Sequence, residues 1–414
     1  MLIFVVAFQY AVSMYELKSF TPIARTNWRN RNQLFGIKPL DRLQHIYCLG
    51  KTGTGKSTLL INMAFDDIYK GHGVCVIDPH ADTVEKLMKL IPEHRKQDVI
   101  YFDATNQSAL TAYNPLYNIP QSQRQLVASE IVLIFKKIFH ENWGNKLEYI
   151  LRFCVLTLLD YPSATLLDIH ALLVDKEFRS RVLIYVTNPY ITSFWVTEYA
   201  LYTPSIQASA IMPILNKIGV FLANDTLRGI VGQQESISIE QCMNENKILL
   251  CNLSKGAIGD DISTILGSFL TTSIQTCAMR RARIQANERI PFYLYIDEAH
   301  SFLSSSFATM LSEVRKYAIG LFLTHQHLEQ LESDVRDAIL GNVGTIICFR
   351  LGLNDAKVME KEFYPAFDFE DFINLPRYNI YIKLLIDGET RRGFSAETIL
   401  CSGNNKKKPP MLRL

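Results

Sequence analysis

Short apolar runs alternate with helix-like segments in residues 41–118. The runs HIYCL, GVCVID and DVIYFD are rich in strand-forming residues, and the segments between them space their apolar residues as an amphipathic helix does. Strands that alternate with helices are typical of βαβ units and of a parallel sheet. This stretch is therefore predicted to form the first part of an α/β core.

The pattern changes in residues 119–235. The segments SQRQLVASEIVLIFKKIF, KLEYILRFCVLTLLDY and IQASAIMPILNKIGVFL carry apolar residues near helical spacing, with few strand signals. Strand-like runs then return in KILLCNL, PFYLYID, IGLFLTH, GTIICFR and YIKLLIDG. We interpret 119–235 as an all-α domain inserted into the core, whose second part covers 236–400. Residues 1–40 form an N-terminal segment with room for short strands, and 401–414 a flexible basic tail.

The first 15 residues, MLIFVVAFQYAVSMY, are the one membrane-like stretch of the chain. A spanning helix needs about 20 apolar residues, and Gln9, Tyr10 and Ser13 dilute this shorter one. Two interpretations stay open, namely a packed strand or helix and a marginal membrane anchor. The protein is accordingly expected in the cytoplasm, either free or held peripherally or by an anchor at the inner membrane.

Composition indicates an ordered globular protein. Hydrophobic residues make up 48% of the 414 positions and charged residues 20%, which leaves little room for disorder. The net charge of +2 gives no argument for nucleic-acid binding. The eight cysteines are scattered without a C-x-x-C pair, so we expect buried thiols in a reducing compartment.

The sequence GKTGTGKS at residues 50–57 fits the phosphate-binding pattern G-x-x-x-x-G-K-[ST], between a strand-like run and a helical one. Backbone N–H groups of such a loop cradle phosphate oxygens, and the following helix adds its positive N-terminal end. Lys56 is expected to neutralise the β- and γ-phosphates and the Ser57 hydroxyl to bind Mg²⁺. ATP and Mg²⁺ are thus the predicted cofactors. The predicted nucleotide-binding residues are Gly50, Lys51, Thr52, Gly53, Thr54, Gly55, Lys56, Ser57 and Thr58.

Two carboxylates, Asp297 and Glu298, follow the buried-strand run FYLYI. In a P-loop enzyme the first holds the Mg²⁺ shell, and the second polarises the attacking water as general base. Asp78 ends the run GVCVID. Its position suits a water-mediated Mg²⁺ contact, and an Asp-Pro turn accounts for it equally well. The candidate metal ligands are therefore Ser57, Asp297 and Asp78.

The next strand-like run, IGLFLTH, leads into Gln326. Ligands of open α/β sheets bind at the carboxyl ends of the strands, so Gln326 is placed to reach a γ-phosphate or its water. We expect His325 and His327 to be neighbouring surface histidines. Arg315 precedes this run and has two interpretations. It either enters a neighbouring subunit's site as an arginine finger, or it is an ordinary surface arginine.

Taken in this order, the motifs resemble the HerA/FtsK superfamily of DNA-pumping ATPases, and within it the TraG/TraD-type coupling ATPases of conjugation and type IV secretion. The segments NKILLCNLSKG, RDAILGNVGTIICFRLG and NLPRYNIYIKLLIDG add to the likeness, which covers roughly residues 25–397. The resemblance implies a RecA-like P-loop NTPase core with an inserted all-α domain. It also implies hexameric rings, with ATP sites at subunit interfaces and DNA in the central channel.

The resemblance further assigns roles to individual residues. Lys56 and Ser57 match the residues that bind nucleotide and Mg²⁺, and Asp297 and Glu298 match the metal and base carboxylates. Gln326 matches the family's phosphate-sensing glutamine. The arginine that acts across the interface is matched by Arg315.

The chain departs from the family pattern at two places. Relatives often carry an arginine just before the histidine that opens the P-loop strand, where this chain has Gln44, and nearby Arg42 is a candidate substitute. Coupling proteins also usually carry an N-terminal membrane hairpin, whereas this chain offers at most one short apolar segment. A second trans-acting arginine and fixed membrane anchoring are therefore both in question.

DNA as a substrate follows from the resemblance and not from the charge. Channel contacts mostly touch phosphate, and a ring supplies them sixfold without a basic monomer. The loop NLSKGAIGDD, with Lys255, Gly256 and Gly259, is the candidate lining of the channel. The other basic positions are Arg280, Arg281, Arg283, Arg391, Arg392 and the lysine tail.

The predicted function is that of a ring-forming, ATP-driven DNA translocase that couples DNA to a conjugative or secretion apparatus, with secretion-channel or relaxosome proteins as partners. Three alternatives stay open. They are a HerA-like pump that works with a nuclease in repair or defence, a nucleotide-gated assembly or adaptor protein, and a secretion ATPase that acts on protein. Glu298 disfavours the adaptor, because a switch has less need of a well-placed base.

Overall fold

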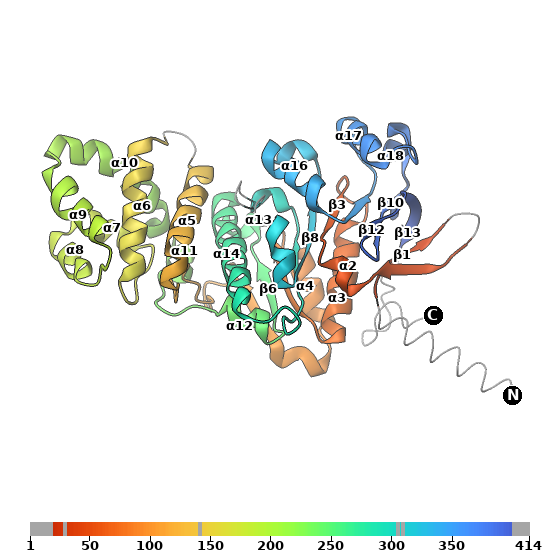
Figure 1. Ribbon diagram of the computed structural model, residues 1–414, viewed down its shortest axis with the longest axis horizontal. Helices are drawn as coiled ribbons and strands as arrows, with labels where there is room; N and C mark the ends of the chain where they lie inside the picture. Colours follow the sequence, from red (N-terminus) through yellow and green to blue (C-terminus); the bar gives the residue numbers. More distant parts are fainter. Residues whose placement is uncertain (1–19, 28–30, 140–142, 304–306, 308–310, 400–414) are drawn as a thin grey trace. The chain divides into compact units, whose positions relative to one another are not determined.

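The computed structural model (Figure 1) describes residues 20–27, 31–139, 143–303, 307 and 311–399. The apolar residues 1–15 and the lysine tail, about which the sequence raised questions, lie outside this part. Within it, no helix combines the length and the apolar character that crossing a membrane requires. The chain divides into two compact units. Among the described residues, the first comprises those up to Tyr101, Glu240–Asn252 and those from Ala278 onward, and the second comprises those of Phe102–Ile239 and Leu253–Cys277.

One mixed sheet of 11 strands runs through the core, in the order β2-β1-β13-β10-β9-β3-β8-β7-β4-β6-β5. Around the P-loop strand the pairing is parallel: β3 pairs with β8 and β9, β7 with β8 and β4, and β4 with β6. From β9 outward through β10, β13, β1 and β2 it is antiparallel. The strands are β1 Thr21–Thr26, β2 Leu34–Ile37, β3 Ile46–Leu49, β4 Gly73–Asp78, β5 Val99–Asp103, β6 Ile248–Asn252, β7 Phe292–Ile296, β8 Ile319–His325, β9 Thr345–Cys348, β10 Asn379–Lys383 and β13 Phe394–Thr398, with a small hairpin of β11 Leu385–Ile386 and β12 Glu389–Thr390.

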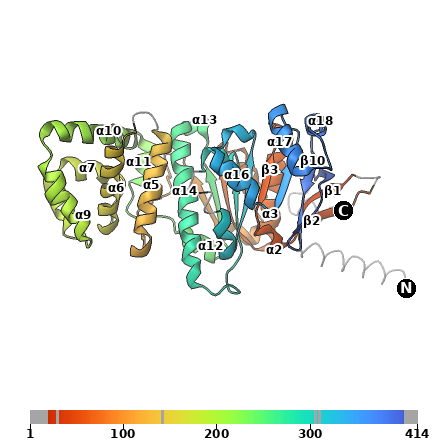
Figure 2. The ribbon, with the colours of Figure 1, turned by 45° about the horizontal axis from the view of Figure 1, so that its top comes forward.

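All eight strand-like runs of the sequence form strands, and the RecA-like core is confirmed. The antiparallel extension beyond β10 contains one strand, β13, that the sequence pattern did not indicate. Its sequence FSAET holds few large apolar residues, and it is only half buried, because it lies between β10 and β1 near one end of the sheet. Figure 2 shows β1 and β2, the outer strands of this extension.

Helices of the first unit cover the sheet and connect its strands. They are α2 Pro39–Arg42, α3 Lys56–Lys70, α4 Asp82–Leu90, α12 Ile239–Asn244, α16 Ser333–Asn342, α17 Leu353–Phe363 and α18 Phe369–Asn374. The helix α3 begins directly at the P-loop and ends at Gly71, whose φ of 92° provides the left-handed residue that often terminates a helix.

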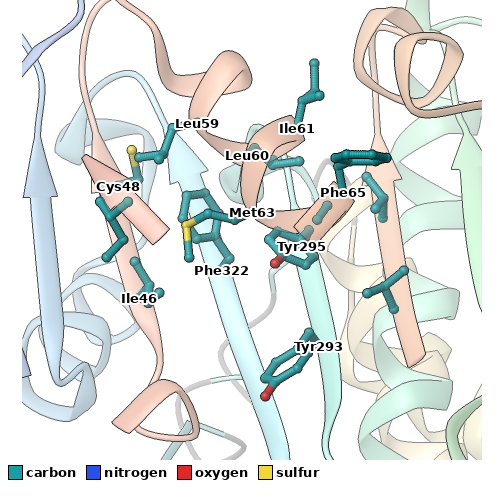
Figure 3. Close-up of a cluster of buried hydrophobic side chains, with 14 of the residues drawn as sticks. Ile46, Cys48, Leu59, Leu60, Ile61, Met63, Phe65, Tyr293, Tyr295 and Phe322 are labelled. Carbon is teal, nitrogen blue, oxygen red and sulfur yellow. The ribbon is translucent and has the colours of Figure 1, made fainter. Parts of the chain in front are cut away.

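The apolar face of α3 is packed onto the centre of the sheet. Leu59, Leu60 and Met63 are fully buried, and Figure 3 shows them among side chains of β3, β7 and β8, including Cys48 and Phe322. Burying a side chain of this size contributes about 1.5–3 kcal/mol. This packing fixes the helix, and with it the phosphate loop at the helix N-terminus.

A buried ion pair lies beside this core. The Arg42 guanidinium is 2% exposed and donates to Oδ1 of Asp67 at 2.5 Å and to the Tyr295 hydroxyl at 2.8 Å. It also lies over the Tyr293 ring, with Cζ 3.8 Å from the ring centroid. The suggestion that Arg42 replaces a trans-acting arginine is therefore wrong, because its charge is buried and neutralised within its own subunit.

The second unit is helical. Its helices are α5 Arg124–Ile138, α6 Asn145–Asp160, α7 Asp168–Val174, α8 Lys176–Leu183, α9 Pro189–Ser193, α10 Pro204–Ala223, α11 Asp225–Val231, α13 Lys255–Ile258 and most of α14 Asp260–Arg280. The sequence pattern grouped 236–400 with the core, whereas residues 253–277 pack in this unit. One cause is a specific contact, in which the Tyr113 hydroxyl donates to the Phe269 carbonyl at 2.7 Å.

The cysteines of the described part of the chain are buried free thiols, as expected. Burial raises the pKa of Cys48 to about 12, so this thiol stays protonated at neutral pH. Cys401 lies outside the described residues.

Candidate active site

The phosphate loop leaves the carboxyl end of β3 and is fixed by its two neighbouring strands. The Gly50 amide donates to the carbonyl of His325 at 3.4 Å, and the Lys51 amide to that of Arg350 at 2.9 Å. Gly55 has a φ of 131°, and a Cβ there would lie 2.9 Å from ring atoms of both Phe349 and Tyr378. Only glycine fits this position, which brings the loop backbone close to any bound phosphate.

Lys56 opens α3 and turns its ammonium back over the loop. The side chain is buried, and Nζ donates to the carbonyl of Gly50 at 2.5 Å and to that of Lys51 at 3.2 Å. These bonds hold a positive charge beside the backbone N–H groups at the helix N-terminus. The arrangement suits an anionic phosphate chain.

The oxygens expected to hold Mg²⁺ lie together at the mouth of the loop. The Ser57 hydroxyl is 3.4 Å from Oδ2 of Asp297, and the Thr324 hydroxyl donates to Oδ1 of the same carboxylate. Thr324 thereby orients Asp297 with its second oxygen toward Ser57. Among the described residues no cluster of three acidic, histidine or cysteine side chains could hold a metal by itself. The pair fits Mg²⁺, which is commonly bound through one or two protein oxygens together with substrate phosphates.

Glu298 is held in an unusual backbone conformation. Its φ of 49° and ψ of 53° are left-handed, which costs a residue other than glycine roughly 1–2 kcal/mol. Such strain is often found at functional sites. The carboxylate is 6% exposed, and Oε2, which has no hydrogen bond within the described residues, lies 3.5 Å from Nδ1 of His300. A buried carboxylate with one oxygen available in this way is suited to activate a water molecule.

Gln326 connects this carboxylate to the phosphate loop. Its Nε2 donates to Oε1 of Glu298 at 2.7 Å, and its Oε1 accepts from the Thr52 hydroxyl at 2.7 Å. The amide thus joins the end of β8 to the end of β7 on one side and to the loop on the other. Sequence motifs indicated Gln326 but not its link to Thr52.

These residues surround a cavity of about 420 Å³, within the size range of small-molecule sites. The cavity also reaches residues that the motifs did not indicate, namely His80, Asp82 and Thr83 after β4 and Arg377 and Tyr378 before β10. Its complete lining is Thr52, Gly53, Gly55, Lys56, Ser57, Thr58, His80, Asp82, Thr83, Asp297, Glu298, Gln326, Arg377 and Tyr378.

Asp78 has a structural explanation in the turn before α4. Its carboxylate accepts hydrogen bonds from the backbone amides of His80 at 2.8 Å, Thr83 at 2.8 Å and Val84 at 3.1 Å. The side chain is fully buried and does not line the cavity. Burial raises its pKa, with the nearby Asp297 carboxylate adding to the shift. The geometry favours the turn over the metal contact.

His325 is not a surface residue, and this expectation was wrong. It is fully buried at the end of β8, where its ring nitrogens lie 3.0 and 3.1 Å from the Tyr47 hydroxyl. Burial, with the nearby His300 and Lys56 side chains, lowers the pKa of His325 to about 3, so the ring is neutral at physiological pH. His327 is exposed, as expected, and lies 3.1 Å from a carboxylate oxygen of Asp355.

Arg315 lies at the amino-terminal ends of the parallel strands, whereas the phosphate loop lies at their carboxyl ends. It belongs to the short helix Val314–Tyr317, which precedes β8, whereas Gln326 follows β8. The strand has seven residues and a length of about 23 Å. The Arg315 side chain is exposed, and its charge contributes, after burial, to the lowering of the pKa of His45 to about 4. Arg315 is therefore remote from its own subunit's site.

The basic residues considered for DNA contact do not form a single patch on the described surface. Arg281 is fully buried and donates to the backbone carbonyls of Met243, Ile290 and Tyr317. Arg280 pairs with Glu240 at 2.8 Å. The other basic positions considered for DNA contact that the structure describes lie on exposed or half-exposed surface, namely Arg283, Arg391 with its partner Glu389, Arg392, and Lys255 with its partner Asp260.

Solved structures with the same fold include the bacterial conjugative coupling protein TrwB without its first 70 residues. It is 14% identical, with a TM-score of 0.60 over 91% of this chain and 88% of that one. TrwB in complex with ADP and Mg²⁺ matches with a TM-score of 0.59 at 14% identity, over 95% and 94%. VirB4 of Thermoanaerobacter pseudethanolicus matches at 0.62 and 14%, over 94% and 98%. No curated protein sequence matches the chain.

The fold and the site define a P-loop NTPase with a RecA-like core. Two segments of the sequence also match family models. Residues 11–150 match the type IV secretory system conjugative DNA transfer family, and residues 291–361 match the TraM recognition site of TraD and TraG. The resemblance to the TraG/TraD-type conjugative coupling ATPases is therefore confirmed.

Proposed function

We propose that the protein is an ATP-driven DNA translocase that works as a hexameric ring and couples DNA to a conjugative type IV secretion system. The observation that carries the proposal is the hydrolytic half of the site. A strained, buried Glu298 receives a hydrogen bond from Gln326, which in turn is bonded to Thr52 of the phosphate loop. A protein that only binds nucleotide has little need of this arrangement.

The residues divide the work of hydrolysis between them. The loop amides and Lys56 bind the phosphate chain, while Ser57 and Asp297 provide the oxygens for Mg²⁺. When bound, Mg²⁺ neutralises charge that develops on the phosphate oxygens. Glu298 accepts a proton from the attacking water. Gln326 is placed to exchange its bond to Thr52 or to Glu298 for one to a phosphate oxygen.

The position of Arg315 supports a shared site. An exposed arginine at the end of the strands opposite its own phosphate loop is available to an adjacent subunit. In a ring where each subunit presents this edge to the next subunit's phosphate loop, every ATP site would be completed by Arg315 from a neighbour. Subunits would then hydrolyse ATP only when assembled.

DNA contact would be mainly electrostatic. The near-neutral chain has scattered exposed basic residues in place of a base-reading module, and six copies would multiply every contact. Lys255, in a short helix after β6, remains the candidate for the channel wall. Affinity should then drop steeply between about 50 and 200 mM salt, as expected for several phosphate contacts.

The matched families suggest the partners of such a ring. A TraM recognition site and a conjugative DNA transfer segment fit relaxosome proteins that deliver DNA to a secretion channel. Such a ring would work in the cytoplasm at the inner membrane. A nuclease as the co-purifying partner would instead support a repair or defence pump.

The deciding experiment measures ATP hydrolysis with Mg²⁺ in the absence and presence of single- and double-stranded DNA, with electron microscopy of the same samples. We expect rings whose turnover rises with DNA, and no turnover in Lys56→Ala. If hexamers hydrolysed ATP at a rate that neither form of DNA changed, the result would contradict the translocase and favour a protein-secretion ATPase. Binding of ATP without turnover would favour the nucleotide-gated adaptor.

A further inference from the structure

Arg377 and Tyr378 form a pair at the rim of the nucleotide cavity. They lie just before β10, and both line the cavity. The Arg377 side chain is exposed, and its Cζ lies 4.7 Å from the centroid of the Tyr378 ring. The guanidinium thus lies over the ring, and the pair brings a cation and an aromatic group to the rim of the cavity. Neither the P-loop pattern nor the acidic motif predicts these residues.

The backbone of Tyr378 is held in a conformation that tyrosine rarely adopts. Its φ is 65°, which for a bulky residue is a genuine outlier. Three hydrogen bonds fix it. The Tyr378 amide donates to the Thr54 carbonyl of the phosphate loop at 2.9 Å, and the Tyr378 carbonyl accepts from the amide and the hydroxyl of Thr398 at 2.8 and 2.9 Å. Strain maintained in this way is typical of ligand-binding positions.

The pair is attached to the phosphate loop through its ring as well. A Cβ on Gly55 would lie 2.9 Å from Cδ1 of Tyr378, so the ring is in contact with the loop backbone. Gly55 immediately precedes Lys56 and Ser57, whose amides open α3. Arg377 and Tyr378 therefore lie beside the part of the loop that would hold the phosphates nearest the nucleoside.

Sheet order separates this pair from the hydrolytic residues. The loop leaves β3, which has β8 on one side and β9 on the other. Gln326, Asp297 and Glu298 follow β8 and β7, and the remaining acidic lining residue, Asp82, follows β4 further along the same side. The strand β10, which Arg377 and Tyr378 precede, lies on the opposite side, beyond β9. The terminal phosphate must lie near the hydrolytic residues, on the side of β8 and β7. The nucleoside at the other end of the phosphate chain therefore points toward β10.

We propose that Arg377 and Tyr378 bind the nucleoside end of the nucleoside triphosphate held by the same subunit's loop. The proposal rests on the ATP binding in the proposed function and adds the residues that distinguish a nucleotide from a bare phosphate chain. A guanidinium and an aromatic ring are both planar and weakly hydrated, which suits either of them to stack against a base.

Calorimetric titration of the full chain with two probes in Mg²⁺, and without DNA, tests the proposal. The probes are the non-hydrolysable ATP analogue ADPNP and inorganic triphosphate, which lacks the nucleoside. In Arg377→Ala we expect ADPNP to bind about 10- to 100-fold more weakly, the range for loss of a base-stacking side chain, while triphosphate binds as in the wild type. Arg377→Lys should behave like Arg377→Ala, because an ammonium cannot stack.

Tyr378→Asn tests the ring separately, since asparagine tolerates the left-handed backbone. It should weaken ADPNP selectively as well. Arg336→Ala is the matched control, because Arg336 is a half-exposed arginine on α16 that pairs with Asp337 and lies outside the cavity. Unchanged thermal melting of each variant checks the fold.

Equal weakening of both probes in Arg377→Ala would overturn the proposal and make Arg377 a phosphate ligand. Unchanged binding of both probes, in a protein where Lys56→Ala binds neither, would also overturn it and leave nucleotide binding intact. If the wild type bound neither probe, the proposed function would fail together with this inference.

Discussion

The side-chain amide of Gln326 donates a 2.7 Å hydrogen bond to Oε1 of Glu298, so the residue matched to phosphate sensing holds the residue matched to the general base. The other end of the same amide accepts from Thr52 in the phosphate loop at 2.7 Å. An amide that moved toward a γ-phosphate would change its bonds to both partners. Binding of a nucleotide and the orientation of the Glu298 carboxylate are thereby connected through the Gln326 side chain.

Replacing Glu298 should separate binding from hydrolysis. Glu298→Gln keeps the shape of the side chain but removes the basic oxygen, so ATP should still bind while turnover falls by about 10²- to 10⁴-fold. Nucleotide titration and a steady-state phosphate-release assay measure the two effects. Glu332→Gln, an exposed residue before α16, is the control. Wild-type turnover in Glu298→Gln would exclude this residue as the base.

The link from Thr52 to Gln326 predicts a graded series. Thr52→Val keeps the branched shape and removes the hydroxyl that donates to Gln326. We expect reduced turnover with nearly unchanged ATP affinity, and a larger loss in Gln326→Ala, which also frees Glu298. In the double variant the losses should be less than additive, because both changes act on one network. Strictly additive losses in turnover would show that Thr52 acts independently.

Arg315→Ala should bind ATP and lose nearly all turnover if the residue is an arginine finger, since such a finger contributes about 10³–10⁵ in rate. Mixing it with Lys56→Ala, which is inactive by itself, should restore part of the activity. In mixed rings some interfaces combine an intact phosphate loop with an intact Arg315 from the neighbour. Mixed rings that form but stay inactive, or full activity in Arg315→Ala alone, would leave the residue as an ordinary surface arginine.

The buried pair of Arg42 and Asp67 predicts a stability effect away from the ATP site. Removing one partner leaves an uncompensated buried charge, so Arg42→Ala should lower the free energy of unfolding by about 3–5 kcal/mol. Denaturant titration measures this. The exposed pair of Lys38 and Asp387 provides the contrast, because Lys38→Ala should cost less than about 1 kcal/mol. If Arg42→Ala and Lys38→Ala lowered the free energy of unfolding equally, burial would not be the cause of the larger loss expected for Arg42→Ala.

His325 predicts a pH dependence of stability. Burial lowers its pKa in the folded state to about 3, and nearby His300, Lys56 and His327 add to the effect, whereas the unfolded value is near 6.5. The unfolded chain therefore binds the proton first as the pH falls. Stability due to this group is complete well above pH 6.5 and decreases as the pH falls through that value, by about 1.4 kcal/mol at pH 5.5.

His325→Gln removes the titrating group while keeping a polar side chain near Tyr47. Its unfolding free energy, measured by denaturant at pH 7.5 and 5.5, should change less between the two values than that of the wild type. The His327→Gln variant, in which an exposed ring is replaced, should keep the wild-type difference. An unchanged difference in His325→Gln would show that another group causes the dependence.

The centre of the fold could be predicted from the sequence because its strands are fully buried. Runs such as FYLYI and IGLFLTH consist almost entirely of strand-forming residues, and the parallel sheet needs this pattern. Asp297, Glu298 and Lys56 were predictable for a related reason, since each stands at a fixed offset from such a run or from the loop glycines.

Other features depend on contacts that no local pattern reveals. Tyr378 is positioned by hydrogen bonds with Thr54 and Thr398, which are distant in sequence, and a left-handed tyrosine has no sequence signal. His325 appeared polar and therefore exposed, yet Tyr47 from the neighbouring strand provides the partner that permits its burial. In both cases the deciding partner is distant in the sequence.

The hydrogen bonds of Tyr378 also concern synthesis of the chain. Thr54 is made early by the ribosome, but the residue that bonds to it follows more than 300 positions later, and Thr398, which fixes that residue, follows later still. Both strands next to β3 likewise come from the second half of the sequence. A nascent chain that already displays the phosphate loop therefore still lacks the neighbours that shape it. The ATP site is therefore complete only when nearly the whole core has been translated.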